Sequence, residues 1–238
     1  MKLLGWALSF VLFAASGAFA QEVATSSGTV IRTPNGIRTL SPIEGLTTEN
    51  GLRQGGRIAE IVLGELTAEV ATLVRSGETL DGEIAAFNQN AKNTQAALVS
   101  KKADLDGRIA IHEAEAARQH AAAARGCPDT ACVARINAWR DRVDASKSWL
   151  EARWSEFKLE NDNAVAKSEA GAKALNARDV ALKAKMGLAY RQLKLCYDYS
   201  LKIREMLKVK FRKEDVHSPI LNTAMEQLKE LSGRGFDR

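Results

Sequence analysis

The connection on which the fold depends reads Gly126-Cys127-Pro128-Asp129-Thr130-Ala131-Cys132. A long segment with a heptad pattern leads into it, and a second such segment follows it. Glycine is common just after the C-terminus of a helix, and proline is common at the first position of the next one. Residues 126–131 therefore predict the turn of a long helical hairpin.

The spacing of the prolines supports two long helices. The 4 prolines are Pro34, Pro42, Pro128 and Pro219. No proline therefore occurs between Pro42 and Pro128 or between Pro128 and Pro219. Proline breaks the interior of a helix, so two long gaps on either side of one proline fit two long helices. Only 6% of the residues are aromatic, which argues against an ordinary globular domain.

Apolar residues follow a heptad pattern in both segments. In the first, they step alternately by four and three residues over positions 59–112. In the second, the same steps cover positions 132–157, slip by one residue, and continue over 165–207 with Ala172 on the apolar side. A heptad repeat held over this length predicts coiled-coil pairing with a left-handed supercoil.

The expected helix bounds follow from the same pattern. The first helix should begin between residues 50 and 56, and the second should begin at Pro128 or Asp129 and end near Glu214. We expect local fraying or a bend near Gly77 and Gly82, because glycine costs about 1 kcal/mol relative to alanine inside a helix.

The first 20 residues have the pattern of a signal peptide. Lys2 supplies a positive n-region, residues 3–15 are apolar, and Ala18-Phe19-Ala20 is a small-x-small cleavage signal. We expect export, with the periplasm as the simplest destination and secretion as the alternative. The formal net charge of +5 becomes +4 when Lys2 is removed with this segment.

Residues 21–50 are rich in Ser, Thr and Gly, and we expect a flexible leader there. The alternative is a docked β-hairpin, because Asn35-Gly36 lies between two β-prone runs and this dipeptide is a hairpin signal. A single helical turn after Pro42 should stop at Gly45.

The predicted fold class is all-α. It consists of a long antiparallel helical hairpin with its turn at 126–131, a short C-terminal helix and a mostly irregular N-terminal segment. The predicted parts are a signal peptide (1–20), the leader (21–50), the coiled-coil hairpin (51–213), and the short helix with a tail (214–238).

Two of the three cysteines lie in the predicted turn. Cys127 and Cys132 can form a disulfide if Cys127 lies outside helical geometry. Cys196 should be roughly 100 Å away along a straight second helix and out of reach of both. We expect a structural disulfide that fixes the turn, and a redox-active pair is the alternative.

Aromatic residues gather after the turn, where Trp139, Trp149, Trp154 and Phe157 lie within nineteen residues. One interpretation is a widened core with cation–π contacts to the first helix. The other is a contact patch for a partner below the turn.

Positive charge gathers near the end of the second long helix. The candidate basic surface consists of Lys202, Arg204, Lys208, Lys210, Arg212 and Lys213. It is either a solvated face, a contact with an anionic membrane surface, or a contact with an acidic polymer or partner. A nucleic acid is a less favoured partner, because no recognition module is present.

The sequence contains no motif of an enzyme. There is no phosphate-binding glycine loop, nucleophile elbow or Cys-x-x-Cys motif. His112 and His120 are eight residues apart, too far to share one metal ion. We therefore predict no catalytic residues, no metal site and no cofactor.

The leading hypothesis is an exported structural or adaptor protein of the cell envelope that acts through helix–helix contacts with a protein partner or with itself. In outline it is similar to periplasmic coiled-coil chaperones and to small periplasmic parts of secretion or conjugation machines, a likeness of shape alone. The alternatives are a chaperone-like binder, a helical component of such a machine, and a redox protein that uses Cys127 and Cys132.

Overall fold

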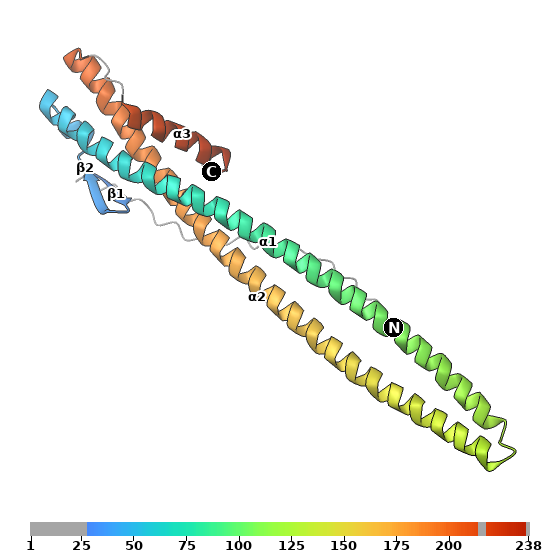
Figure 1. Cartoon of the computed structure of the whole chain (residues 1–238). Helices are drawn as coiled ribbons and strands as arrows, with labels where there is room; N and C mark the ends of the chain where they lie inside the picture. Colours follow the sequence, from blue (N-terminus) through green and yellow to red (C-terminus); the bar gives the residue numbers. More distant parts are fainter. Residues whose placement is uncertain (1–27, 214–217, 237–238) are drawn as a thin grey trace.

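The computed structural model describes residues 28–213 and 218–236. In chain order its elements are β1 (Thr29–Thr33), β2 (Gly36–Leu40), the 3-10 turn η1 (Ile43–Gly45), α1 (Glu49–Ala124), α2 (Thr130–Phe211) and α3 (Pro219–Gly233). The helices α1 and α2 form a long hairpin, and β1, β2 and α3 lie towards the end away from its turn (Figure 1). The predicted all-α hairpin with a short C-terminal helix is confirmed.

The helix α1 begins slightly earlier than predicted because Thr48 caps it. Thr48 Oγ1 accepts a hydrogen bond of 3.0 Å from the main-chain N of Gly51, a donor that has no partner within the helix. The helix is continuous through Gly77 and Gly82, where the sequence predicted local fraying or a bend. A Cβ atom at Gly77 would lie 3.5 Å from Met186 Cε, which means that α2 packs closely against this turn of α1.

The helix α2 ends at Phe211, where Arg212 adopts the left-handed conformation with φ of 50°. The predicted end, near Glu214, lies just outside the described residues. The short helix α3 begins at Pro219 as its sequence predicts, because the fixed φ of proline suits the first helical position.

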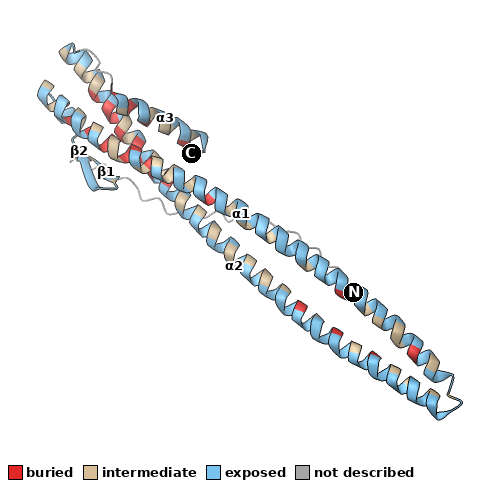
Figure 2. Ribbon diagram, viewed as in Figure 1, coloured by how far each residue is buried: buried red, intermediate tan, exposed pale blue. Residues whose placement is uncertain are grey.

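The main hydrophobic core lies at the end of the hairpin away from the turn, as Figure 2 shows by its buried residues. We call this end the base: β1, β2, α3, residues 49–74 of α1 and residues 186–211 of α2. Each of its five elements contributes a fully buried side chain: Ile31, Leu40, Leu63, Leu193 and Leu231. Three helices and a two-stranded sheet thus enclose apolar surface that two helices alone could not bury.

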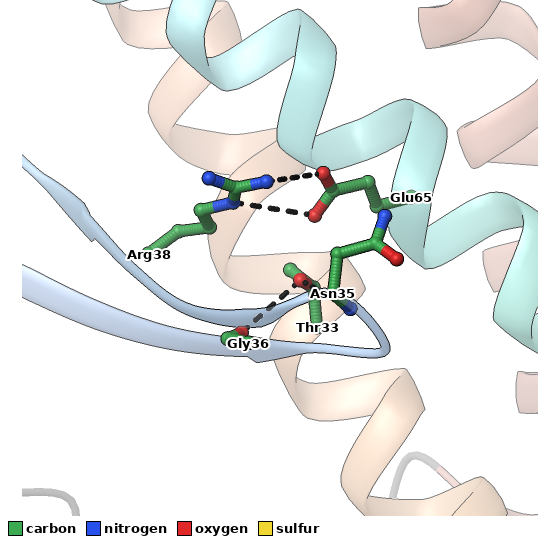
Figure 3. A network of polar contacts seen from close by, with 5 residues as sticks. All are labelled: Thr33, Asn35, Gly36, Arg38 and Glu65. Carbon is green, nitrogen blue, oxygen red and sulfur yellow. Dashed lines mark hydrogen bonds and ion pairs between the residues drawn. The ribbon is translucent and has the colours of Figure 1, made fainter.

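The strands β1 and β2 pair antiparallel and dock onto the base. Ile31 and Leu40 are buried in its core, and Arg38 forms a two-point ion pair with Glu65 of α1, with Nη2–Oε1 of 2.7 Å (Figure 3). The docked hairpin is therefore the correct alternative for residues 29–40, and the expectation of a flexible leader is wrong there. Residues 21–27 lie outside the described part of the chain.

The rest of the hairpin, residues 75–185, has only a narrow core, and we call it the arm. Its buried apolar side chains are Leu80 and Leu105 on α1 and Val143, Leu150 and Phe157 on α2. Most other residues of the arm are exposed or half-buried (Figure 2). The arm is therefore a thin structure that projects from a well-packed base.

The register of α2 in the middle of the arm differs from the predicted one. Gly171 is half-buried and faces α1, whereas Ala172, which the heptad pattern placed on the apolar side, is exposed. A Cβ atom at Gly171 would lie 2.5 Å from Phe87 Cε2, closer than real Cβ atoms approach other atoms. The Phe87 ring occupies the space that a side chain at residue 171 would need, and this contact sets the register here.

Among the described residues, no helix combines the length and the apolar character needed to cross a membrane. The predicted signal peptide, residues 1–20, lies outside the part of the chain that the structure describes.

Candidate functional site at the tip of the hairpin

The turn that joins α1 to α2, which we call the tip, lies where the sequence predicted it. α1 ends at Ala124, and Gly126 adopts the left-handed conformation with φ of 76°, which favours glycine after a helix C-terminus. Asp129 caps α2, because its Oδ1 accepts a hydrogen bond of 2.7 Å from the main-chain N of Cys132.

The two cysteines of the tip lie at disulfide distance. The Cα atoms of Cys127 and Cys132 are 5.5 Å apart, within the usual range for this bond, and the structure joins their sulfur atoms. Cys127 belongs to residues 125–129, the link between the two helices, and Cys132 belongs to the first turn of α2. The bond therefore fastens the link to the start of α2 and restricts how the helices can diverge.

An open groove of about 530 Å³ lies beside this disulfide. α1 supplies Arg118, Ala121 and Ala122 to its lining, and the link supplies Arg125 and Gly126. α2 supplies Cys132, Ile136 and Trp139. The groove is mainly apolar inside, with the two arginines as its charged groups.

Trp139 has a fixed position in the groove. Its Nε1 donates a hydrogen bond of 3.2 Å to Glu115 Oε1 on α1, and the residue is half-buried. The indole is thus held by its polar end while the rest of the ring lines the groove beside Ile136, as tryptophan often does where one end is apolar and the other polar. Ala121 and Ala122, opposite these large side chains, leave space above them.

The tip carries an excess of positive charge. Residues 116–140 contain four arginines, Arg118, Arg125, Arg135 and Arg140, against Asp129 as the single acid. All four arginines are exposed, and none forms an ion pair with a described residue, although Arg118 Nε donates to the main-chain oxygen of Ala114. Their charges are therefore available to a bound group.

The four residues of the predicted aromatic patch differ in their contacts. Trp139 lies in the groove at the tip, while Trp149 and Trp154 lie further down the arm beside cations. Arg108 and Arg153 lie 5.4 and 5.5 Å from the centre of the Trp149 ring. These contacts agree with the interpretation that the aromatic residues widen the core through cation–π interactions.

Trp154 and Phe157 complete this part of the arm. Lys102 lies 5.7 Å from the Trp154 ring centre, and the rings of Trp154 and Phe157 are 5.5 Å apart. Phe157 is buried and contributes to packing between α1 and α2, whereas Trp149 is 43% exposed.

The predicted basic surface lies at the base, and two of its six members are paired. Arg204 pairs with Glu60 at 3.2 Å, and Lys213 lies 3.6 Å from a Glu49 carboxylate oxygen. The other four are exposed and form no ion pair with a described residue: Lys202, Lys208, Lys210 and Arg212. Two ion pairs thus reduce the charge of this surface.

Cys196 lies at the base, apart from the other cysteines, as its sequence position predicted. It is buried, and its Sγ lies 3.4 Å from the main-chain oxygen of Ala59, to which the thiol donates. Burial raises the pKa of the Cys196 thiol to about 12, so it remains protonated at neutral pH.

His112 is half-buried and His120 is exposed on α1. Within residues 28–213 and 218–236, no group of three or more His, Cys, Asp or Glu side chains is placed to hold a metal ion. The described tip offers an apolar surface and positive charges, an arrangement that suits binding.

The sequence interpretation missed the groove and the role of Arg118 and Arg125 in it. The signal that could have found them is the excess of arginines over acids in residues 116–140, four against one. Comparisons with protein-family models, with curated proteins and with solved structures find no match, so the function has to be argued from this geometry.

Proposed function

We propose that the protein is an exported structural or adaptor protein of the cell envelope, most simply in the periplasm, that acts through helix–helix contacts of its arm. The observation that carries this proposal is the exposure of large apolar side chains on both helices of the arm. The most exposed are Val99 and Ile111 on α1 and Leu159 and Val180 on α2, with exposed fractions between 48% and 66%.

The physical argument concerns the width of the arm. Most of the stability of a helix in a protein comes from packing of its apolar face, and two helices side by side can cover only part of each other. The seam of the arm is half-buried along most of its length, and its heptad pattern suits coiled-coil packing. A further helix, from a partner or from a second copy, would bury apolar surface that the arm leaves in water.

Site-specific photo-cross-linking in the organism that produces the protein tests this proposal. A photoreactive amino acid is placed singly at Val99, Ile111 and Leu159 on the arm. As a matched control it is placed at Ile37, an apolar residue of β2 that is 67% exposed at the base. We expect a discrete cross-linked product from the arm positions only. Products from Ile37 alone, or none from the arm, would contradict the proposal.

A second candidate function is contact between the base and an anionic membrane surface. The supporting observation is the exposure of Lys202, Lys208, Lys210 and Arg212, none of which forms an ion pair with a described residue. Each such cation contributes about 1 kcal/mol near an anionic surface. Changing all four to Gln should weaken binding to anionic vesicles, and so should added salt.

The matched control for this second candidate changes four exposed arm lysines to Gln instead, removing the same charge: Lys92, Lys158, Lys167 and Lys173. The vesicle binding of this control should match that of the unchanged protein. Equal loss in both variants would assign the effect to net charge, and no loss in either would exclude an electrostatic contact of the base.

A further inference from the structure

We propose that the groove at the tip binds an acidic linear segment of a partner protein. One apolar side chain of that segment packs against Ile136 and Trp139, and carboxylates on either side of it pair with Arg118 and Arg125. This inference deepens the proposed function by giving the tip a partner of stated chemistry, and it does not depend on contacts along the arm.

The size and lining of the groove fit a short peptide segment. A volume of about 530 Å³ is within the range of sites that hold small ligands. Its two large apolar residues come from α2, and opposite them stand the small residues Ala121 and Ala122 of α1. An apolar side chain placed between the helices would contact both, and it would cover indole surface that is now open to water.

The disulfide keeps this space open. Cys132 and Gly126 both line the groove, and the bond from Cys127 fastens the link to α2 beside it. The hydrogen bond from Trp139 Nε1 to Glu115 fixes the opposite end of the lining. A site held on both sides loses little conformational entropy when a segment binds.

Charge complementarity identifies the class of segment. Arg118 and Arg125 belong to the lining, and Arg135 and Arg140 carry two more unpaired positive charges on the first turns of α2. The one acid of residues 116–140, Asp129, already accepts the hydrogen bond that caps α2. Arginine pairs with carboxylates through two parallel hydrogen bonds, so acidic side chains are the groups that this tip binds best.

The shape of the site favours a peptide over a lipid surface. A flat anionic membrane would use the arginine charges and leave Ile136 and Trp139 without a partner, because the groove lies between the two helices. An extended segment uses the charges and the apolar lining together. The tip of an arm that projects from the base is also well placed to reach another protein.

Selection from a phage-displayed library of short random peptides on the oxidised full-length protein tests the proposal. We expect the selected peptides to share one large apolar residue flanked by Asp or Glu. The best peptide is then synthesised, and its affinity is measured by fluorescence anisotropy. Arg118→Glu and Arg125→Glu should each weaken binding about tenfold or more, because each replaces a charge-assisted pair by a repulsion.

Two controls separate the site from general charge. Arg75→Glu makes the same charge change at an exposed arginine whose Nε also donates to a main-chain oxygen four residues earlier, and it should leave the affinity unchanged. Ala122→Phe fills the groove without changing the charge and should weaken binding as much as Arg118→Glu does. Reduction of the disulfide should also weaken binding.

Several outcomes would overturn the proposal. Selected peptides that lack acidic residues would do so. An affinity that does not change with Arg118→Glu and Ala122→Phe would also do so, as would one that falls as much with Arg75→Glu as with Arg118→Glu. If the tip variants instead abolish binding to anionic vesicles while no peptide is selected, the tip contacts a lipid surface. Failure here leaves the cross-links from Val99, Ile111 and Leu159 unaffected, so it is distinct from failure of the proposed function.

Discussion

The ionised carboxylate of Glu65 forms one of the contacts between the β-hairpin and α1. Its carboxylate accepts hydrogen bonds from Arg38 and lies beside Thr33 and Asn35 at the turn between β1 and β2 (Figure 3). The Arg38 guanidinium, with help from Thr33 and Asn35, lowers the pKa of Glu65 from its ordinary value of 4.5 to about 2. The charged form is therefore the one that the docked hairpin favours.

Acidification should weaken this docking. Because the pKa of Glu65 is lower in the folded protein, its contribution to stability is fully present above about pH 4.5 and is lost as the pH falls towards 2. We expect the methyl NMR signals of Ile31, the side chain of β1 that is buried in the core of the base, to shift over this range. Glu65→Gln should produce a similar shift at neutral pH.

Glu156→Gln is the matched control for Glu65. It removes a carboxylate that pairs with an arginine at the same distance of 2.7 Å, but on the arm and within one helix. This variant should leave the Ile31 signals unchanged. Unchanged Ile31 signals in Glu65→Gln would show that Ile31 and Leu40 alone hold the hairpin in place.

Cys196 is a second residue whose reactivity depends on its surroundings. Burial keeps its thiol protonated, and only the thiolate reacts with alkylating reagents. We expect no alkylation of Cys196 in the folded, oxidised protein at neutral pH and complete alkylation after unfolding, as measured by intact mass. Rapid alkylation of the folded protein would mean that the base opens around residue 196.

At the scale of single elements, the contact between Gly171 and Phe87 sets how α2 lies on α1 in the arm. Gly171→Ala should lower the free energy of unfolding by about 1–3 kcal/mol through overpacking, partly offset by about 1 kcal/mol of helix propensity. Chemical unfolding followed by circular dichroism measures this difference.

Gly107 supplies the matched control for this element. It lies in α1, and a Cβ atom there would meet nothing within 4 Å, so Gly107→Ala should raise the free energy of unfolding by about 0.5–1 kcal/mol. Equal gains for both substitutions would show that Phe87 moves aside freely and does not set the register.

The elements also show which parts of the structure a sequence can predict. The tip was predictable because glycine, proline and a capping aspartate act locally, and so were the two helices, because their proline-free heptad patterns are long. The docking of β1 and β2 was not predictable. It depends on Ile31, Leu40 and Arg38 meeting α1 across a fold that local patterns do not describe.

The candidate site was predictable only in part for the same reason. The Cys127–Cys132 pair follows from its spacing around Pro128. The groove, in contrast, depends on which residues of α1 and α2 lie opposite each other along the hairpin. The Trp139, Trp149 and Trp154 cluster looks continuous in the sequence. Only the pairing of the helices shows that Trp139 lines the groove at the tip, whereas Trp149 and Trp154 lie beside cations further along the arm.

At the scale of the whole molecule, the main hydrophobic core lies in the base, and the arm extends away from it. Side chains of β1, β2, α1, α2 and α3 pack together at the base. Of the elements that the structure describes, α1 and α2 alone extend along the arm (Figure 1). The arm presents apolar residues along its length and an arginine-lined groove at its end. Both proposed contacts require that the arm stand away from the base in solution.

Small-angle X-ray scattering of the monomer, extrapolated to low concentration, tests this requirement most directly. With 82 residues in α2, the molecule should be about 120 Å long, and its radius of gyration should be about 35 Å. A chain of this size folded into a compact globule would have a radius of gyration of about 18 Å. A value near 35 Å agrees with the projecting arm, and a value near 18 Å would contradict it.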